Sequence, residues 1–171
     1  MISFDKYKEE FELPYMNWYR RYLPEIEKAR VHAAYIEALK HIPKPRCFPW
    51  ANGLLEELRR QGKMMAVLSA LEEETLNVLI TEHGMAGFFT EVMGSVHDKR
   101  DAMHVLLDKC GFKKQKTVFI GDMVHDIEAG KAAGIRTFAV TWGYDSRKKL
   151  LKADPGIVVG DIEMLRRVLL D

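Results

Sequence analysis

The stretch Val118-Phe-Ile-Gly-Asp122-Met-Val-His-Asp126-Ile-Glu-Ala-Gly-Lys-Ala-Ala-Gly134 decides the fold of this chain. It opens with a continuous apolar run, which is typical of a strand buried on both faces of a sheet. A short polar turn with two aspartates follows. The residues from His125 to Ala133 are then expected to form a helix that ends at Gly134, because glycine suits the left-handed position after a helix. A buried strand, a tight turn and a helix in this order indicate one half of a βαβ unit.

The same alternation continues on both sides of this stretch. Short apolar runs predict further strands at Met64–Leu68, Glu91–Met93, Arg136–Thr141 and Ile157–Val159. Helical patterns lie between and around them, at Trp50–Gln61, Glu72–His83, Lys99–Cys110 and Asp161–Leu170. Strands that alternate with helices of about ten residues predict an α/β fold, with a parallel sheet and helices on both of its faces.

The first 42 residues differ from the rest because they carry only helical signals. Helices are expected from the Ser3 cap to Leu13, from Tyr15 to Leu23, and from Pro24 to about Lys40. The apolar stripe of the third helix would comprise Ile26, Ala29, Ala33, Ile36 and Leu39. Three prolines between residues 41 and 49 indicate a linker. We therefore expect two domains, a helical one at 1–42 and an α/β core at 43–171.

The composition excludes several classes of protein. The chain has 171 residues, with 26 Lys and Arg against 25 Asp and Glu, so it offers no global field for nucleic acid or an anionic membrane. No apolar run approaches the roughly 20 residues that span a bilayer, and the N-terminus lacks the apolar stretch of a signal peptide. Cys47 and Cys110 have no metal-ligand spacing and are expected to be free thiols. We therefore expect a soluble, cytoplasmic protein.

Polar residues follow successive predicted strands. Ser69 comes after the first strand, Lys99 lies in the segment after the second, and Asp122 and Asp126 follow the third. Because ligands bind outside the carboxyl ends of parallel strands, we expect these side chains at one edge of the sheet. Carboxylates hold Mg²⁺ through hard oxygen atoms, and a lysine and a hydroxyl can neutralise and orient phosphoryl oxygens. The combination predicts a site for a divalent metal and a phosphate.

Each of these residues also has a purely structural interpretation. Ser69 suits a turn or a helix cap, Lys99 suits a solvated surface, and two aspartates suit the start of a helix. His97 and His125 flank the expected site, where they are candidates to touch a substrate or are ordinary loop histidines. It is the order of the polar residues at successive strand ends that favours a functional site.

From Phe48 to its end, the chain resembles the haloacid dehalogenase (HAD) superfamily, a family of hydrolases dominated by Mg²⁺-dependent phosphatases. Met65-Ala-Val-Leu-Ser69 is similar to the second motif of the family, Lys99 to the third, and residues 118–134 to the fourth. The loop Thr141-Trp-Gly-Tyr144 resembles that of phosphoglycolate phosphatase-like members. The helical region before residue 42 resembles part of the small helical cap that follows the first strand of the family's Rossmann-like core.

The resemblance implies a role for each matching residue. Ser69 and the backbone of Ala70 would contact the phosphoryl group, and Lys99 would stabilise a phosphoaspartyl intermediate. Asp122 would bind Mg²⁺ directly and Asp126 through water. The substrate would be a small phosphorylated metabolite.

The first motif of the family, a strand that ends in the nucleophile sequence D-x-D-G-T, is missing. The one candidate is Asp5, because Asp5-Lys-Tyr7 is similar to the D-x-Y start of the dehalogenase branch. Lys8 and Glu9 replace the Gly-Thr turn, the surrounding apolar spacing is helical, and the interval to Ser69 is short for a strand and a complete cap. We therefore expect the chain to begin inside its cap and to lack about 30–40 residues, including the first core strand and its nucleophile.

This absence has structural and functional consequences. In the family, the first strand lies between the Ser69 strand and the Asp122 strand, so the two should either pair directly or keep unpaired inner edges. Unpaired edges favour a homo-oligomer or a strand swap. We expect a HAD-type phosphatase that works through an aspartyl-phosphate, with weak or no turnover by this chain. The alternatives are a non-catalytic HAD-like binding protein and, on Asp5-Lys-Tyr7 alone, a 2-haloacid dehalogenase. No nucleic-acid or membrane partner is expected.

Overall fold

A computed structural model describes residues 2–171, apart from the side chains of Phe4, Asp5 and Leu39. The strands are β1 (Ala66–Leu68), β2 (Glu91–Met93), β3 (Val118–Gly121), β4 (Arg136–Val140) and β5 (Ile157–Val159). The helices are α1 (Phe4–Glu10), α2 (Tyr15–Tyr22), α3 (Lys28–Leu39), α4 (Ala51–Arg60), α5 (Glu73–Glu82), α6 (Lys99–Cys110), α7 (Val124–Ala133), α8 (Arg147–Lys152) and α9 (Ile162–Leu170). None of the helices in the described part of the chain has the length and apolar character needed to cross a membrane.

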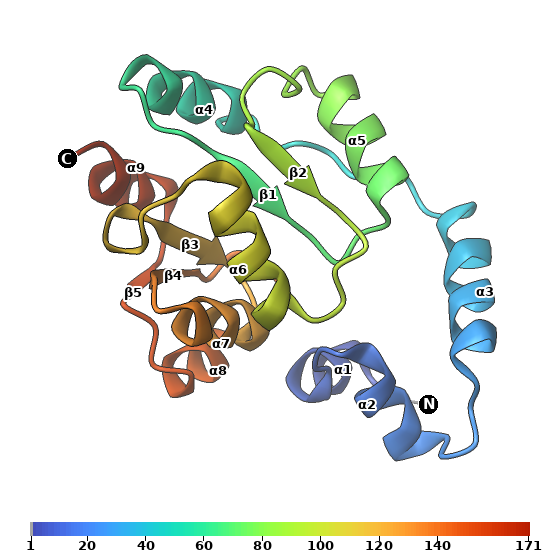
Figure 1. Cartoon of the computed structure of the whole chain (residues 1–171). Coiled ribbons are helices and arrows are strands. Elements are labelled where there is room, and N and C mark those ends of the chain that lie inside the picture. The colour runs from blue at the N-terminus through green and yellow to red at the C-terminus, as the bar shows by residue number, and fades with distance from the viewer. Residues whose placement is uncertain (1) are drawn as a thin grey trace.

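The strands form two parallel sheets, as expected for an α/β fold built from βαβ units. β1 pairs with β2, and β3, β4 and β5 form the second sheet in that order. β1 and β3 are the neighbouring strands of the two sheets (Figure 1). Within residues 2–171 no ladder joins them, so each keeps an unpaired inner edge. Of the two arrangements expected from the sequence, the structure adopts the one with unpaired edges.

Helix α6 holds the two sheets together through a shared hydrophobic core. Leu68 of β1 packs with Met103 and Leu107 of α6, and the same cluster contains Ala133 and Ile135 at the junction of α7 and β4. These side chains are all less than 9% exposed, and burying one large apolar side chain contributes roughly 1.5–3 kcal/mol. The sheets are therefore fixed relative to each other by a helix, although no strand pairing connects them.

The larger sheet is covered by helices on both faces. Phe138 and Val140 of β4 pack with Leu54 of α4 and Leu165 of α9. Ala139, which points to the opposite face because side chains alternate along a strand, packs with Ile127 of α7 and with α8. This alternation confirms the layered architecture that the apolar run of β4 predicts.

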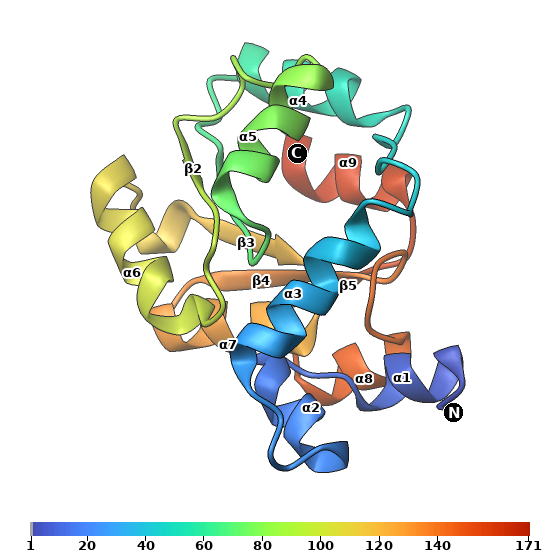
Figure 2. The same cartoon turned by 90° about the vertical axis from the view of Figure 1, so that its right-hand side faces the viewer.

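The N-terminal helices lie at the carboxyl-end side of the strands. α1 and α2 sit next to α8, and α3 passes in front of the strand ends (Figure 2). Helix α1 starts at the predicted cap, where Ser3 Oγ accepts a hydrogen bond from the Lys6 N–H. The predicted second helix is also present, as Tyr15–Tyr22.

The expected start of the third helix at Pro24 is wrong, because α3 begins at Lys28. Pro24 and Glu25 instead form a turn in which the Ile26 N–H donates to the Leu23 carbonyl. The fixed φ of proline suits the second position of such a turn as well as the first turn of a helix, so the sequence alone did not separate the two.

The expected apolar stripe of the third helix is also not buried. Val31 is the buried residue of α3, whereas Ala29, Ala33 and Ile36 are exposed. The side chain of Leu39 lies outside the described residues.

Helix α8 was not predicted from the sequence. Its sequence RKKLLK is short and mostly charged, and only the Ser146 cap marks its start.

Candidate active site

The turn between β3 and α7 is held by Asp126. Its Oδ2 accepts hydrogen bonds from the backbone N–H groups of Asp122 and Met123, at 3.1 and 3.0 Å. A side chain on Gly121 would overlap the Asp126 carboxylate, so the close approach requires glycine there. Asp126 is only 2% exposed. The carboxylate therefore closes the turn and lies at the positive end of α7.

A buried ion pair joins this turn to α6. Lys99, the first residue of α6, places its Nζ 2.7 Å from Asp126 Oδ1. Lys99 is 9% exposed, so both charges are largely removed from water. Such a pair is stable only when each charge is compensated, and here the other oxygen of Asp126 is satisfied by the two N–H groups. The predicted third-motif and fourth-motif residues are thus in direct contact.

His125 makes a further contact between α7 and the start of α6. Its Nε2 accepts a hydrogen bond from the Lys99 backbone N–H at 2.9 Å, which requires a neutral ring with its proton on Nδ1. Burial lowers the pKa of His125, which is 4% exposed, and this favours the neutral form. In this arrangement the Nε2 of His125 is occupied, so the residue orients the start of α6.

Asp122 presents a carboxylate oxygen at the carboxyl end of β3. Its Oδ2 accepts the Tyr144 N–H at 2.6 Å, and its carbonyl accepts the Asp145 N–H at 3.0 Å. A side chain on Gly143 would overlap the Asp122 carboxylate. Oδ1 has no hydrogen-bond partner among the described residues, so this oxygen is the one available to a ligand.

Ser69 and Ala70 lie at the matching end of β1, in the other sheet. The Ser69 N–H donates to the Met93 carbonyl at 2.9 Å, which continues the β1–β2 pairing by one residue. Ser69 Oγ accepts the Leu71 N–H at 3.1 Å, so the hydroxyl closes a local turn and still has its own proton to donate. No hydrogen bond within residues 2–171 connects Ser69 or Ala70 to Lys99 or Asp122. The structure therefore divides the predicted site between the two sheets.

His97 lies between the loop after β2 and the N-terminal helices. Its ring meets the Tyr15 ring edge to face, with 5.5 Å between centroids. Burial lowers the pKa of His97, with smaller contributions from Lys28 and His32. Its Nδ1 is buried and has no partner in the described part of the chain. His97 thus carries a buried polar atom that no described residue satisfies.

The residues present match the chemistry of Mg²⁺ only in part. Asp122 supplies a hard oxygen of the kind that Mg²⁺ prefers, whereas both oxygens of Asp126 are engaged by Lys99 and by backbone N–H groups. The described residues contain no group of three or more His, Cys, Asp or Glu side chains arranged to hold a metal ion. Of the two predicted metal ligands, only Asp122 therefore has a carboxylate oxygen that is free of hydrogen bonds to the described residues.

Asp5, the one candidate nucleophile, lies in helix α1 and not at the end of a strand. Its side chain is outside the described residues.

Asp145, a buried carboxylate in the loop after β4, was not predicted from the sequence. Its position after the fourth strand was the signal that could have identified it, because that loop ends at the same edge as Asp122.

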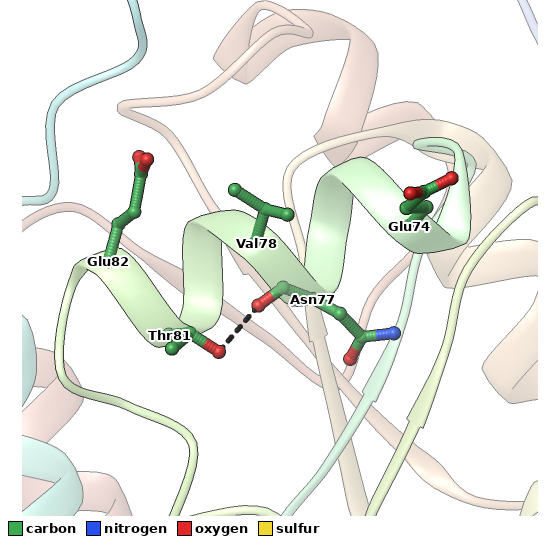
Figure 3. Close-up of a pocket in the computed structure, with 5 residues that line it drawn as sticks. All are labelled: Glu74, Asn77, Val78, Thr81 and Glu82. Atoms are coloured by element: carbon green, nitrogen blue, oxygen red, sulfur yellow. Dashed lines mark hydrogen bonds between the residues drawn. The ribbon is translucent and has the colours of Figure 1, made fainter.

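A hollow of about 460 Å³ lies elsewhere, along α5 (Figure 3). It is lined by Glu74, Asn77, Val78, Thr81 and Glu82, all from one helix. None of the strand-end residues described above contributes to it. The hollow is therefore a surface feature apart from the candidate site.

The fold and the strand-end residues define the class of protein: a parallel α/β core with a buried lysine–aspartate pair and a further carboxylate at the carboxyl end of β3. Comparison with known proteins identifies the family. Residues 2–140 match the haloacid dehalogenase-like hydrolase family, and the chain belongs to it. The resemblance on which the sequence analysis relied is therefore confirmed.

Similar proteins are phosphoglycolate phosphatases. That of Aliivibrio fischeri is 30% identical over 127 residues, which are 71% of this chain and 56% of the relative. That of Synechococcus elongatus is 28% identical over 116 residues, 67% of this chain and 55% of the relative. The chain thus spans about half the length of these curated relatives.

Solved structures agree on the fold. A proposed phosphatase of Clostridium difficile superposes with a TM-score of 0.76 at 23% identity, over 89% of this chain and 75% of that one. A haloacid dehalogenase-like hydrolase of Streptococcus pneumoniae gives a TM-score of 0.70 at 21% identity, over 86% and 72% of the two chains. At these identities the likeness concerns the fold alone.

Proposed function

We propose that this chain carries the metal- and phosphate-binding part of a Mg²⁺-dependent HAD-type phosphatase that acts on a small phosphorylated metabolite. The observation that carries the proposal is the buried Lys99–Asp126 pair, in which the Asp126 carboxylate also accepts the backbone N–H of Asp122. The similarity to phosphoglycolate phosphatases supports a small phosphorylated acid as the substrate.

Each residue would have a distinct task. Asp122 would hold Mg²⁺ directly and Asp126 through water, and Mg²⁺ when bound supplies positive charge next to the phosphoryl oxygens. Lys99 would neutralise charge on the transferring phosphoryl group, while the Ser69 hydroxyl and the Ala70 N–H would orient its oxygens. His97, with its unused Nδ1, faces the N-terminal helices and would meet the remainder of the substrate. Residues 1–42 would serve as a partial cap over this edge.

The nucleophile would arrive on a strand between β1 and β3. Both strands have unpaired inner edges, and Ile120 of β3 is 36% exposed although it lies within an apolar strand. An aspartate at the carboxyl end of such a strand would attack phosphorus and expel the alcohol, and water would then hydrolyse the acyl-phosphate. A polypeptide segment other than these 171 residues would have to supply this strand, because none of the described strands ends in the nucleophile motif. Without it, we expect weak or no turnover.

A complementation experiment tests this function. The chain is assayed for release of phosphate from phosphoglycolate with Mg²⁺, alone and with a synthetic peptide that consists of an apolar strand ending in Asp-x-Asp-Gly-Thr. We expect turnover only with the peptide, and its loss when the peptide aspartate or Asp122 is changed to asparagine.

Other results would point to the alternatives. Binding of Mg²⁺ and phosphate with no turnover under any condition would favour a non-catalytic binding protein. Chloride release from a 2-haloacid would instead favour the dehalogenase branch. Turnover that survives Asp122→Asn would contradict the site assignment.

A further inference from the structure

Asp145 is a buried carboxylate that no sequence motif includes. It is 2% exposed and lies in the loop between β4 and α8. Its Oδ2 accepts the Val124 N–H at 2.8 Å, and its Oδ1 is 2.6 Å from Lys149 Nζ. Its own N–H donates to the Asp122 carbonyl at 3.0 Å. Asp145 therefore connects the β4–α8 loop to the backbone on both sides of Met123, through its side chain to Val124 and through its own N–H to Asp122.

These contacts fix the direction of the Asp122 carboxylate. Asp122 Oδ2 accepts the N–H of Tyr144, the residue directly before Asp145. Because Tyr144 directly precedes Asp145 in the chain, we expect a shift of Asp145 to displace the Tyr144 N–H and to turn the carboxylate that accepts it. Gly143 lets the loop approach this closely, since a side chain there would overlap Asp122. Asp145 thus acts on Asp122 through backbone groups and does not touch a ligand itself.

Lys149 extends the connection to the N-terminal helices. Its Nζ donates to the Phe11 carbonyl, just after α1, at 2.7 Å, in addition to its ion pair with Asp145. The Phe11 ring lies 5.2 Å from the Tyr144 ring, and Lys8 Nζ donates to the Gly143 carbonyl at 3.4 Å. The end of α1 is therefore attached to this loop through Tyr144 and Gly143, and to α8 through Lys149.

We propose that Asp145 is a positioning residue, which orients Asp122 for a divalent cation, and that Lys149 makes this orientation depend on the seating of α1. The inference rests on the proposed function in taking Asp122 as a metal ligand. Groups that orient a ligand from behind typically change metal affinity by about 10- to 100-fold when they are removed. A single isosteric substitution of Asp145 should therefore have a measurable effect.

Two measurements on the full chain test the proposal. Isothermal titration with Mg²⁺ alone gives the affinity, and amide hydrogen exchange reports the Val124 and Tyr144 N–H groups. Asp145→Asn keeps the shape of the side chain but replaces one accepting oxygen with a donor. We expect about 10-fold weaker Mg²⁺ binding and faster exchange at both amides. Lys149→Met should have a smaller effect of the same sign, and Lys149→Arg should restore affinity.

Asp154→Asn is the matched control. Asp154 is an exposed carboxylate that pairs with Lys131 at 2.8 Å, and its left-handed backbone conformation is one that asparagine also adopts. We expect this variant to bind Mg²⁺ and to exchange as the unchanged chain does. It removes one ion-paired aspartate from the same half of the molecule, so it corrects for the change in net charge.

The outcomes separate this inference from the proposed function. If the unchanged chain does not bind Mg²⁺, both are overturned. If it binds, and Asp122→Asn abolishes binding while Asp145→Asn leaves affinity and local exchange as they were, only the role of Asp145 is overturned. A lower unfolding midpoint with unchanged affinity would assign Asp145 a purely structural role, and an unchanged Lys149→Met variant would remove the link to α1.

Discussion

The two sheets of this protein hold their polar strand-end residues in different ways. In the larger sheet, the turn after β3 is tied by Asp126, Lys99 and Asp145, each of which is at most 9% exposed. In the smaller sheet, strands of three residues are only partly covered, and Ser69 closes one local turn. The carboxylates at the end of β3 are therefore preorganised by contacts between distant segments, whereas Ser69 is positioned by its local turn, by the β1–β2 pairing and by the packing of β1 on α6.

The largest effect that this difference predicts is on stability. Lys99→Met would leave the Asp126 charge buried with only its two backbone partners, so we expect the free energy of unfolding to fall by about 3–5 kcal/mol. Lys44→Met is the control, because Lys44 pairs with Glu82 in solvent, and such pairs contribute about 1 kcal/mol or less. Urea denaturation of both variants measures the contrast. Equal losses would show that the buried pair has no special role.

Crowding next to Asp122 should have the next largest effect. Gly143→Ala introduces a methyl group where the Asp122 side chain lies, and overpacking of this kind costs about 1–3 kcal/mol. Gly53→Ala is the control, since Gly53 lies in α4 with no atom near the added methyl group, and alanine there should stabilise by about 0.5–1 kcal/mol. Thermal unfolding with and without Mg²⁺ gives both values. A neutral Gly143→Ala variant would mean that the turn is not as tightly held as described.

A smaller effect is expected in the serine half. Ser69→Ala removes the bond from the Leu71 N–H and should cost about 0.5–1.5 kcal/mol. Ser146→Ala removes a similar bond from the Lys149 N–H, at the start of α8, and should cost about the same. Titration with inorganic phosphate then distinguishes the two, because only Ser69→Ala should weaken binding. If Ser69→Ala and Ser146→Ala lost phosphate affinity equally, Ser69 would be no more than a turn residue.

The smallest predicted effect is a pH dependence that comes from His125. Because burial lowers the pKa of His125 in the folded chain below its ordinary 6.5, the unfolded chain takes up this proton first as the pH falls. Stability should therefore decrease from pH 7 to pH 5, by at most about 1.4 kcal/mol per pH unit for one proton. Unfolding midpoints across this range should depend less on pH in His125→Gln. His104→Gln, which removes an exposed histidine of α6, should keep the slope of the unchanged chain.

Local sequence determined much of the secondary structure. The apolar runs at Ala66–Leu68 and Val118–Gly121 form strands, and the left-handed Gly134 ends α7 as predicted. These features depend on residues close together in the sequence. They follow from the spacing of apolar side chains, from the preference of each residue type for helix or strand, and from the conformational freedom of glycine. The order of Ser69, Lys99 and Asp122 at successive strand ends likewise required only the knowledge that parallel strands finish at one edge.

Only the tertiary structure decided what each polar group does. Asp126 pairs with Lys99, His125 accepts the Lys99 N–H at the start of α6, and the Asp145 side chain accepts the Val124 N–H. The separation of the two sheets was likewise set by the packing of α6. The physical reason is that these bonds join residues more than twenty positions apart. Their partners are chosen by how the helices pack on the sheets, and one-dimensional spacing carries no record of that choice.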